Sequence, residues 1–379
     1  MAQPLPETMR ALVCDGLGQP LVVKTVPTPQ PTMGSVVVRV LCVQSQRSLQ
    51  TILSGKTPFT FPQPMTPGNT GIGRVAAVGP DTTSLAVGQL VMLDTFIRAR
   101  DDPGLQILWG FWDGPSPASR RFAAENWSMG SYAEFVRAPL ENTWALDETR
   151  LCGGPADGGL GYTLEDLAVI PEALVPYGGL RSLALQAGET VVVAPATGGF
   201  SGAAVNVARA MGATVLAMGR NTAVLERLAS RSSPQGAVRP VPNTGDTQAD
   251  AAALRAAAAG AIHAYLDFSP PQAAASTHLR SCFLALGQYG RAVMMGLLSS
   301  DLPVSYLRFG LQNQTIRGQF MYERADVRGL IQLVEKGMLR LGAGGGYELR
   351  GKYKLEDIDE CFRATAAGSE AGQFVLITP

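Results

Sequence analysis

The chain has 379 residues, of which 46% are hydrophobic and 16% charged, and its 31 basic and 31 acidic side chains cancel. A length above twice a typical domain of roughly 150 residues predicts two domains, and the large apolar fraction excludes global disorder. A net charge of zero does not favour a polyanionic partner, so no nucleic-acid ligand is expected. No apolar run reaches the roughly 18 residues that a membrane span needs, so no membrane association is expected.

The few cysteines and histidines limit the available chemistry. The cysteines stand far apart, at positions 14, 42, 152, 282 and 361, which disfavours a disulfide framework or a compact zinc knuckle. Segment 1–10 has no apolar stretch typical of a secretory signal, so no signal is expected and a reducing, cytoplasmic location is favoured. The only histidines, His263 and His278, lie on or near expected helices and are predicted to be structural or surface residues.

The first third of the chain is predicted to be rich in β-strands. Short β-branched runs separated by proline and glycine stand at 21–26, 36–43, 71–78 and 88–93. Strands at this spacing, with no helical periodicity between them, suggest a small barrel or sandwich. Residues 94–130 carry several aromatic side chains and are predicted to form a long structured loop, and strand character resumes at 131–136.

The middle of the chain alternates between strand and helix. Strands are expected at 190–194, 213–218, 264–268 and 291–296, and helices at 201–211, 222–230, 250–260 and 277–285. This alternation is the signature of a doubly wound parallel sheet, so the fold class is α/β. The last part is predicted to hold a strand at 315–320, helices at 325–337 and 355–366, a loop at 342–346, and a final strand at 373–378.

A glycine-rich turn follows the first of these middle strands and opens a helix. Its segment 191–203 reads Val-Val-Val-Ala-Pro-Ala-Thr-Gly-Gly-Phe-Ser-Gly-Ala, with A-x-G-x-x-S where G-x-G-x-x-G would be expected. A backbone of this kind can approach a pyrophosphate closely, and N–H groups at the helix start can bind it. The alternative is a glycine turn needed only for tight packing. The predicted cofactor contacts of the turn are Thr197, Gly198, Gly199, Phe200 and Ser201.

The end of the next strand predicts which cofactor is preferred. Sites for NAD usually have Asp or Glu there to hold the ribose 2′-hydroxyl, but this strand ends in Gly219-Arg220-Asn221. Gly219 makes room, and the guanidinium of Arg220 can bind the oxygens of a 2′-phosphate in a bidentate fashion. The sequence therefore favours NADPH over NADH, and the alternative for Arg220 is a solvated surface side chain.

Several segments, in this order, resemble the medium-chain dehydrogenase/reductase superfamily, which includes zinc alcohol dehydrogenases and quinone or enoyl reductases. Residues 67–79 are similar to its G-H-E-x-x-G-x-V-x-x-V-G segment, 87–91 to its G-D-R-V turn, and 130–136 to its G-x-(F/Y)-A-E-Y strand. Residues 287–296 are similar to its G-G-x-x-V-x-x-G strand and 372–376 to its closing G-K-x-V strand.

The resemblance implies a two-domain architecture. A GroES-like β-barrel catalytic domain would begin the chain at 1–165, and a Rossmann NADP-binding domain would follow at 166–305. Residues 306–379 would then return to the catalytic domain, with the active site in the cleft between the domains. The resemblance also implies a homodimer.

The chain departs from this family at its metal positions. Zinc members bind the catalytic metal through a Cys after the second strand and the His of G-H-E, but the aligned residues here are Gln46 and Asn69, with Thr70 in place of Glu. Neither amide is a normal zinc ligand. The cysteines of the family's structural zinc lobe are also missing from 95–129. The resemblance therefore implies a zinc-free member with no metal site, in which Cys42 is a core residue rather than a ligand.

Loss of zinc restricts the chemistry, because zinc acts as the Lewis acid on the substrate oxygen in these enzymes. Hydride addition to an activated acceptor is less demanding, since donors can hold the developing enolate charge. The amides of Gln46 and Asn69 would supply those donors, or would merely fill the vacated metal site. Tyr177 matches the aromatic residue of the family's T-A-Y segment and would be a proton donor or a packing residue.

The remaining candidates lie at strand ends and in the aromatic loop. Ser269 and Gly296 follow later strands of the Rossmann pattern and are predicted to contact the cofactor. The predicted pocket for an apolar or conjugated carbonyl substrate consists of Arg47, Trp109, Trp112 and Tyr322. The alternatives are a surface role for Arg47 and a role for the tryptophans in fastening the loop to the barrel.

The sequence thus predicts an NADPH-dependent, zinc-free oxidoreductase that transfers hydride to an activated C=C or C=O in an enone, quinone, enoyl thioester or ketone. One alternative is a metal-independent NADP alcohol dehydrogenase. Another is a catalytically inactive NADPH-binding sensor or scaffold.

Overall fold

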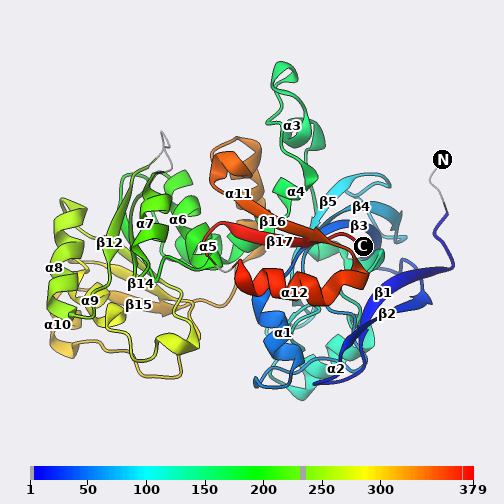
Figure 1. Ribbon diagram of the computed structural model, residues 1–379, viewed down its shortest axis with the longest axis horizontal. Coiled ribbons are helices and arrows are strands. Elements are labelled where there is room, and N and C mark those ends of the chain that lie inside the picture. The colour runs from blue at the N-terminus through cyan, green and yellow to red at the C-terminus, as the bar shows by residue number, and fades with distance from the viewer. Residues whose placement is uncertain (1–3, 231–235, 369) are drawn as a thin grey trace. The chain divides into compact units, whose positions relative to one another are not determined.

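A computed structural model describes residues 4–230, 236–368 and 370–379 (Figure 1). The chain divides into two compact units, each with its own core. Unit 1 comprises 1–171, 348–369 and 374–379, and unit 2 comprises 172–347 and 370–373. Of the segment 1–10, in which no secretory signal is expected, residues 1–3 lie outside the described part.

The division differs from the predicted domain boundaries at three places, one of which is the segment 370–373, which belongs to unit 2. Residues 306–347 belong to unit 2, although they were expected to return to the N-terminal domain. The reason is strand β15 (Thr315–Gly318), which continues the parallel sheet of unit 2 by pairing with β14 (Arg291–Met294). The segment 166–171, expected to open the nucleotide-binding domain, belongs to unit 1.

Unit 1 is built from antiparallel strands. Its largest sheet runs β16-β17-β3-β4-β5-β9, with β8 paired to β3, and β1-β2 and β6-β7 form two-stranded sheets. The strands are β1 (Thr8–Cys14), β2 (Leu21–Pro27), β3 (Ser35–Gln44), β4 (Gly71–Val78), β5 (Leu90–Leu93), β6 (Phe96–Arg98), β7 (Gln106–Leu108), β8 (Phe135–Pro139), β9 (Thr143–Ala145), β16 (Glu348–Tyr353) and β17 (Gln373–Ile377). The helices are α1 (Arg47–Leu53), α2 (Pro117–Asn126), α3 (Glu148–Cys152), α4 (Leu164–Leu167) and α12 (Ile358–Ala367).

The region 94–130 is not the long loop that the sequence predicts. It contains the hairpin β6-β7 and helix α2, and α2 begins with a signal that the sequence carries. Ser116 and Ser119 form a reciprocal capping box there, and Pro117 occupies the first helical position. The two strands were harder to predict, because each has three residues and pairs only with the other.

Unit 2 contains a six-stranded parallel sheet in the order β12-β11-β10-β13-β14-β15. The remaining strands are β10 (Thr190–Ala194), β11 (Thr214–Gly219), β12 (Val238–Pro242) and β13 (Ala264–Asp267). The helices are α6 (Gly199–Ala210), α7 (Thr222–Ala229), α8 (Thr247–Ala258), α9 (His278–Ala285), α10 (Tyr306–Leu311) and α11 (Arg324–Glu335), and α5 (Ile170–Ser182) enters from unit 1. The predicted doubly wound sheet is confirmed, with β10 at the predicted residues.

The helices of unit 2 cover both faces of this sheet. Leu254 of α8 and Phe283 of α9 pack in one apolar cluster with Val192 of β10, while α6 and α7 lie on the opposite side (Figure 1). The chain changes sides after β12, so the order reverses between β10 and β13. Ligands of doubly wound sheets bind at the carboxyl ends of the strands beside such a reversal. Within the described residues, none of the helices combines the length and hydrophobicity needed to cross a bilayer.

Candidate functional site

The glycine turn between β10 and α6 has the geometry of an anion site. Gly198 is the N-cap of α6, and its amide donates to the hydroxyl of Ser201 at 3.1 Å. The first amides of a helix have no acceptor within the helix, and together with the helix dipole they favour a bound phosphate. Thr197, Gly198, Gly199, Phe200 and Ser201 all lie in this turn or in the first turn of α6, at the carboxyl end of the central strand β10.

Gly219 and Asn221, at the end of β11, each have a local structural role. A Cβ on Gly219 would lie 2.9 Å from the methyl group of Thr197. The glycine therefore lets β11 approach the glycine turn between β10 and α6, which is called the phosphate turn below. Asn221 is the N-cap of α7, and its side-chain oxygen accepts from the amide of Val224 at 3.2 Å. Between them, the side chain of Arg220 is exposed. Gly219 and Asn221 thus have structural roles, whereas the exposed side chain of Arg220 is available to a ligand.

Two carboxylates that the sequence analysis missed lie beside this turn. Glu172, in the first turn of α5, would be overlapped by a Cβ on Gly199. Glu370 contacts the start of α7, where its carboxylate pairs with Arg227 at 2.7 Å and accepts from Asn221 at 3.3 Å. Glu370 thus brings a carboxylate to Asn221, although the segment Gly219-Arg220-Asn221 itself has none. No local sequence signal could have found Glu370, since it stands 149 positions after Asn221.

Ser269, beyond the end of β13, is part of a buried polar chain. Its hydroxyl donates to Asp267 at 2.5 Å and lies 2.7 Å from Nε2 of His278, whose Nδ1 lies 2.7 Å from the hydroxyl of Ser276. Because the Ser269 hydroxyl donates its hydrogen bond to Asp267, Nε2 of His278 donates to Ser269. The predicted cofactor contact through the Ser269 side chain is not supported, because that side chain is 1% exposed and used in this network. His278 is buried as well, so it is structural and not at the surface.

Gly296 has a packing explanation too. A Cβ there would lie 2.6 Å from the carboxylate of Asp267 and from the carbonyl of Ser269. The glycine thus allows the segment after β14 to approach the end of β13. This close approach shapes the carboxyl edge of the sheet whether or not Gly296 itself touches a cofactor.

The tyrosines predicted to act in catalysis or substrate binding are packed within unit 2. The Tyr177 hydroxyl lies where a Cβ on Gly329 of α11 would be, at 2.6 Å, and burial raises the pKa of its phenol. Tyr322 is 3% exposed and packs on α5, since a Cβ on Gly178 would lie 2.7 Å from its own Cβ. The geometry thus gives both side chains a packing role rather than the predicted roles of proton donor and pocket wall.

In unit 1, the positions aligned with zinc ligands lie at the start of α1 and just before β4. Gln46 is the N-cap residue of α1 and is partly buried. Asn69 follows Gly68, whose φ of +100° is a conformation that favours glycine, and the Ser131 hydroxyl donates to the carbonyl of Thr70 at 2.5 Å. Asn69 is 9% exposed, and its Oδ1 is buried without a hydrogen-bond partner in the described structure. A buried amide oxygen of this kind is costly and calls for a partner.

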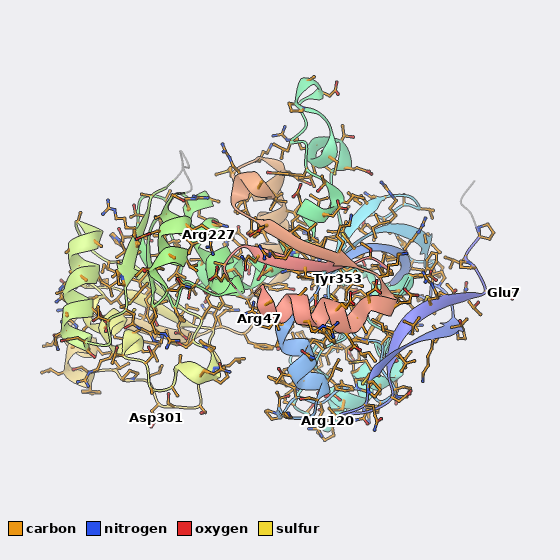
Figure 2. All side chains as sticks on the ribbon, viewed as in Figure 1. Glu7, Arg47, Arg120, Arg227, Asp301 and Tyr353 are labelled. Carbon is orange, nitrogen blue, oxygen red and sulfur yellow. The ribbon has the colours of Figure 1, made fainter. Side chains whose placement is uncertain are left out.

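The aromatic residues of the predicted pocket fall into the core of unit 1. Trp109 is fully buried and donates its indole N–H to the carbonyl of Met129 at 2.9 Å. Trp112 packs edge-on against Phe59, with ring centroids 5.4 Å apart. The prediction that they line a substrate pocket is wrong for Trp109, which fastens the segment to the core. Arg47, labelled in Figure 2, donates to the carbonyl of Gly368 at 3.3 Å and so is not simply a solvated side chain.

A zinc ion does not fit the donors that the chain presents. No three His, Cys, Asp or Glu side chains within 4–230, 236–368 and 370–379 are grouped so that they could hold a metal. Cys42 is buried, and burial raises the pKa of its thiol to about 12, so the thiolate that zinc requires is disfavoured. The two aligned amides are poor ligands, and no chemical step is assigned to zinc here.

Comparison with known proteins agrees with this organisation. The sequence profile described as "Alcohol dehydrogenase GroES-like domain" matches residues 32–148, and that described as "Zinc-binding dehydrogenase" matches 199–336. The chain belongs to the medium-chain dehydrogenase/reductase superfamily. Its fold combines a GroES-like domain with a Rossmann-like domain.

Relatives of this superfamily member cover nearly its whole length. An alcohol dehydrogenase of Geobacillus stearothermophilus is 25% identical over 97% of this chain and 99% of its own. The structure of a thermostable alcohol dehydrogenase from Pyrobaculum aerophilum is 21% identical, covers 98% of this chain and 100% of its own, and gives a TM-score of 0.70. The structure of a Sinorhizobium meliloti 1021 protein assigned as a zinc-binding dehydrogenase was solved with NADP bound. It is 17% identical, covers 99% of this chain and 100% of its own, and gives a TM-score of 0.75. The alcohol dehydrogenase relative supports an oxidoreductase function, and the solved structures support the fold.

Proposed function

We propose that the chain is an NADPH-dependent oxidoreductase that works without zinc and reduces an activated C=C or C=O in an enone, quinone, enoyl thioester or ketone. One observation carries the proposal: the glycine turn of unit 2 ends a buried strand and opens helix α6, while the positions of unit 1 aligned with zinc ligands hold the amides of Gln46 and Asn69. On this proposal the chain keeps the cofactor half of the reaction and replaces its metal half.

The nucleotide end of the proposal rests on backbone and charge. The amides that open α6 would hold the pyrophosphate, and the exposed guanidinium of Arg220 would bind the 2′-phosphate. When bound, the nicotinamide supplies the hydride. The residues of the chain orient it and exclude water.

The substrate end rests on Asn69. Its buried Oδ1 has no partner in the described structure, and rotating the amide places Nδ2 at the same point. An amide N–H held there by the backbone would donate to the oxygen of a conjugated carbonyl, on which negative charge develops during reduction. An amide donor is weaker than a metal ion, which favours an activated acceptor over a simple ketone.

The first test is a binding titration with NADPH and NADH, followed by NADPH oxidation with a panel of enones, quinones and ketones. The proposal expects NADPH to bind at least ten times more tightly than NADH, a difference of about 1.4 kcal/mol. Turnover should survive dialysis against a chelator. About one tightly bound zinc per chain by elemental analysis would contradict zinc independence, and equal binding of the two dinucleotides would remove Arg220 as the selector.

Two other functions are alternatives to this one. The relatives are named alcohol dehydrogenases, which supports an alcohol dehydrogenase, here one that would use NADP without a metal. A product that gains a hydroxyl while keeping its C=C would exclude reduction of an enone C=C. The other alternative is a catalytically inactive NADPH-binding sensor or scaffold. That reading requires NADPH binding without turnover on any member of the panel.

The proposal includes a small-molecule substrate, a homodimer and a cytoplasmic location. Strand β15 ends the six-stranded sheet, and edge strands tend to pair or be covered. Near it, Tyr306, Leu307 and Leu311 of α10 are 92%, 70% and 68% exposed. If a dimer covers these side chains, sedimentation equilibrium should give twice the monomer mass. All five cysteines are free thiols, as a reducing compartment allows.

A further inference from the structure

The C-terminal segment 370–373 is bound to the phosphate turn of unit 2. The chain before and after it belongs to unit 1, but the segment itself belongs to unit 2. The amide of Ala371 donates to the carbonyl of Thr197 at 3.1 Å. The side chain of Ala371 lies against Gly202, where any Cβ would overlap it. These contacts fix the backbone of Glu370 beside the turn that is proposed to bind the dinucleotide.

The carboxylate of Glu370 connects two parts of the β11–α7 corner. Its Oε2 pairs with Arg227 at 2.7 Å, and its Oε1 accepts from Asn221 at 3.3 Å. The side chains of Glu370 and Arg227 are 38% and 43% exposed, so the pair is reachable by a ligand. Figure 2 labels Arg227, which lies in the last turn of α7.

This corner carries both kinds of group that recognise the 2′ position of a nicotinamide dinucleotide. A carboxylate accepts from the 2′-hydroxyl of NADH, and an arginine binds the 2′-phosphate of NADPH. Arg220 is the arginine expected from the sequence, and Arg227 is a second one on the same corner. The ion pair with Glu370 engages Arg227 and adds a negative charge where a 2′-phosphate would sit.

We propose that Glu370 is a specificity-determining residue that weakens the preference of this chain for NADPH by holding Arg227 and repelling the 2′-phosphate. The inference rests on the proposed function, since it requires a dinucleotide at the turn. It also assigns the cofactor selectivity to a residue from the C-terminal segment, in addition to Arg220 at the end of β11. Release of Arg227 from Glu370 would give the 2′-phosphate a second guanidinium.

The experiment compares Kd values for NADPH and NADH in the wild type and in Glu370→Gln, by calorimetry at low and moderate salt. The variant should bind NADPH at least five times more tightly and NADH no more tightly than the wild type does. Raising the salt should shrink the difference, because the charges are exposed. Glu360→Gln is the matched control: it removes a carboxylate from an exposed pair with Arg363 on α12, and it should leave both Kd values within twofold.

A second variant separates the two effects of Glu370. When Arg227→Ala is added to Glu370→Gln, most of the gain in NADPH affinity should disappear, since no guanidinium is left to release. A Kd ratio unchanged by Glu370→Gln, or changed equally by Glu360→Gln, would overturn the inference while the proposed function stands. If neither the wild type nor Glu370→Gln binds either dinucleotide, the proposed function fails and takes this inference with it.

Discussion

The phosphate turn of unit 2 and the Gln46/Asn69 positions of unit 1 have diverged from their family in different ways. The turn departs from the usual glycine spacing but still ends a buried strand and opens a helix at Gly198. Its chemistry comes from backbone amides, so it tolerates changes of side chain. A metal site depends on the side chains themselves, and the proposed function has two amides in place of its ligands. A backbone site can therefore drift in sequence and keep its function, whereas a side-chain site that drifts takes on different chemistry.

The largest expected effect comes from adding charge to the backbone site. Ser201→Asp keeps an oxygen that accepts from Gly198 and places a carboxylate among the amides at the start of α6. A like charge near the pyrophosphate should weaken binding of both dinucleotides about 100-fold, which is about 2.7 kcal/mol. Titration with NADPH measures the effect, while thermal unfolding should show an unchanged or higher Tm, since an acidic residue suits a helix N-terminus.

Ser201→Asn is the neutral control for this change. It offers a similar oxygen without the charge and should bind NADPH within threefold of the wild type. If the asparagine variant loses as much affinity as the aspartate variant, the loss comes from packing around Ser201, which is 4% exposed. The start of α6 is then not the anion site.

The next effect tests the side-chain site. Asn69→Ala removes the buried amide, and with it the donor proposed for the substrate oxygen. Loss of such a donor typically costs one to three orders of magnitude in kcat, and about 30-fold is expected with an activated acceptor. The Kd for NADPH should not change, because Asn69 belongs to unit 1 and the phosphate turn to unit 2. Steady-state kinetics and a titration together give both values.

Asn126→Ala, on the exposed face of α2, is the matched control and should keep its full kcat. A variant at Asn69 with normal kcat would mean that the amide only fills the space of the lost metal. The protein would then have a nucleotide site but no side chain that assists the substrate, as the scaffold hypothesis requires.

The same contrast between backbone and side chain explains what could be predicted from the sequence. The strand β10 and the alternation after it follow from apolar runs and periodicity, which are local signals. The contacts of Glu370 and the chain from Asp267 to His278 depend on segments that only the fold brings together. Gly219 and Gly296 were assigned to cofactor contact from their motif positions, whereas close packing already accounts for both. Trp109 had an expected alternative as a fastening residue, and burial decides in its favour.

The buried hydrogen-bond chain from Asp267 to His278 should contribute more to stability than the partly buried His263. His278→Leu removes one hydrogen bond from Ser269 and one from Ser276 beside a buried carboxylate, and the unfolding free energy should fall by about 2–3 kcal/mol. His263 is less buried and accepts one hydrogen bond, from the amide of Thr190, so His263→Leu should cost about 1 kcal/mol. Urea unfolding of the two variants measures the difference, and equal losses would show that the chain beside β13 is not specially stabilising.

The smallest effect compares an ion pair in each unit as pH is lowered. The Arg74 hydrogen bond lowers the pKa of Glu148 below its usual 4.5, and both side chains are well exposed. Burial alone would raise the pKa of Glu189, but hydrogen bonds from the Gln186 amide and Arg291 lower it overall. A carboxyl whose pKa is lower in the folded state stabilises the fold above its unfolded pKa, and this contribution disappears as pH falls through the folded pKa.

Glu148→Gln should therefore cost about 0.5 kcal/mol at pH 7, and Glu189→Gln about 1 kcal/mol, because the second pair is less exposed. Both differences from the wild type should shrink below about pH 4.5 and vanish below the folded pKa values, when the wild-type carboxyls are also neutral. Chemical denaturation at pH 7, 5 and 3 checks the sign. A loss of stability that persists at pH 3 would come from packing of the side chain and not from its charge. For Glu189 this would mean that its contact with Arg291 acts through shape, unlike the screened surface pair of Arg74 and Glu148.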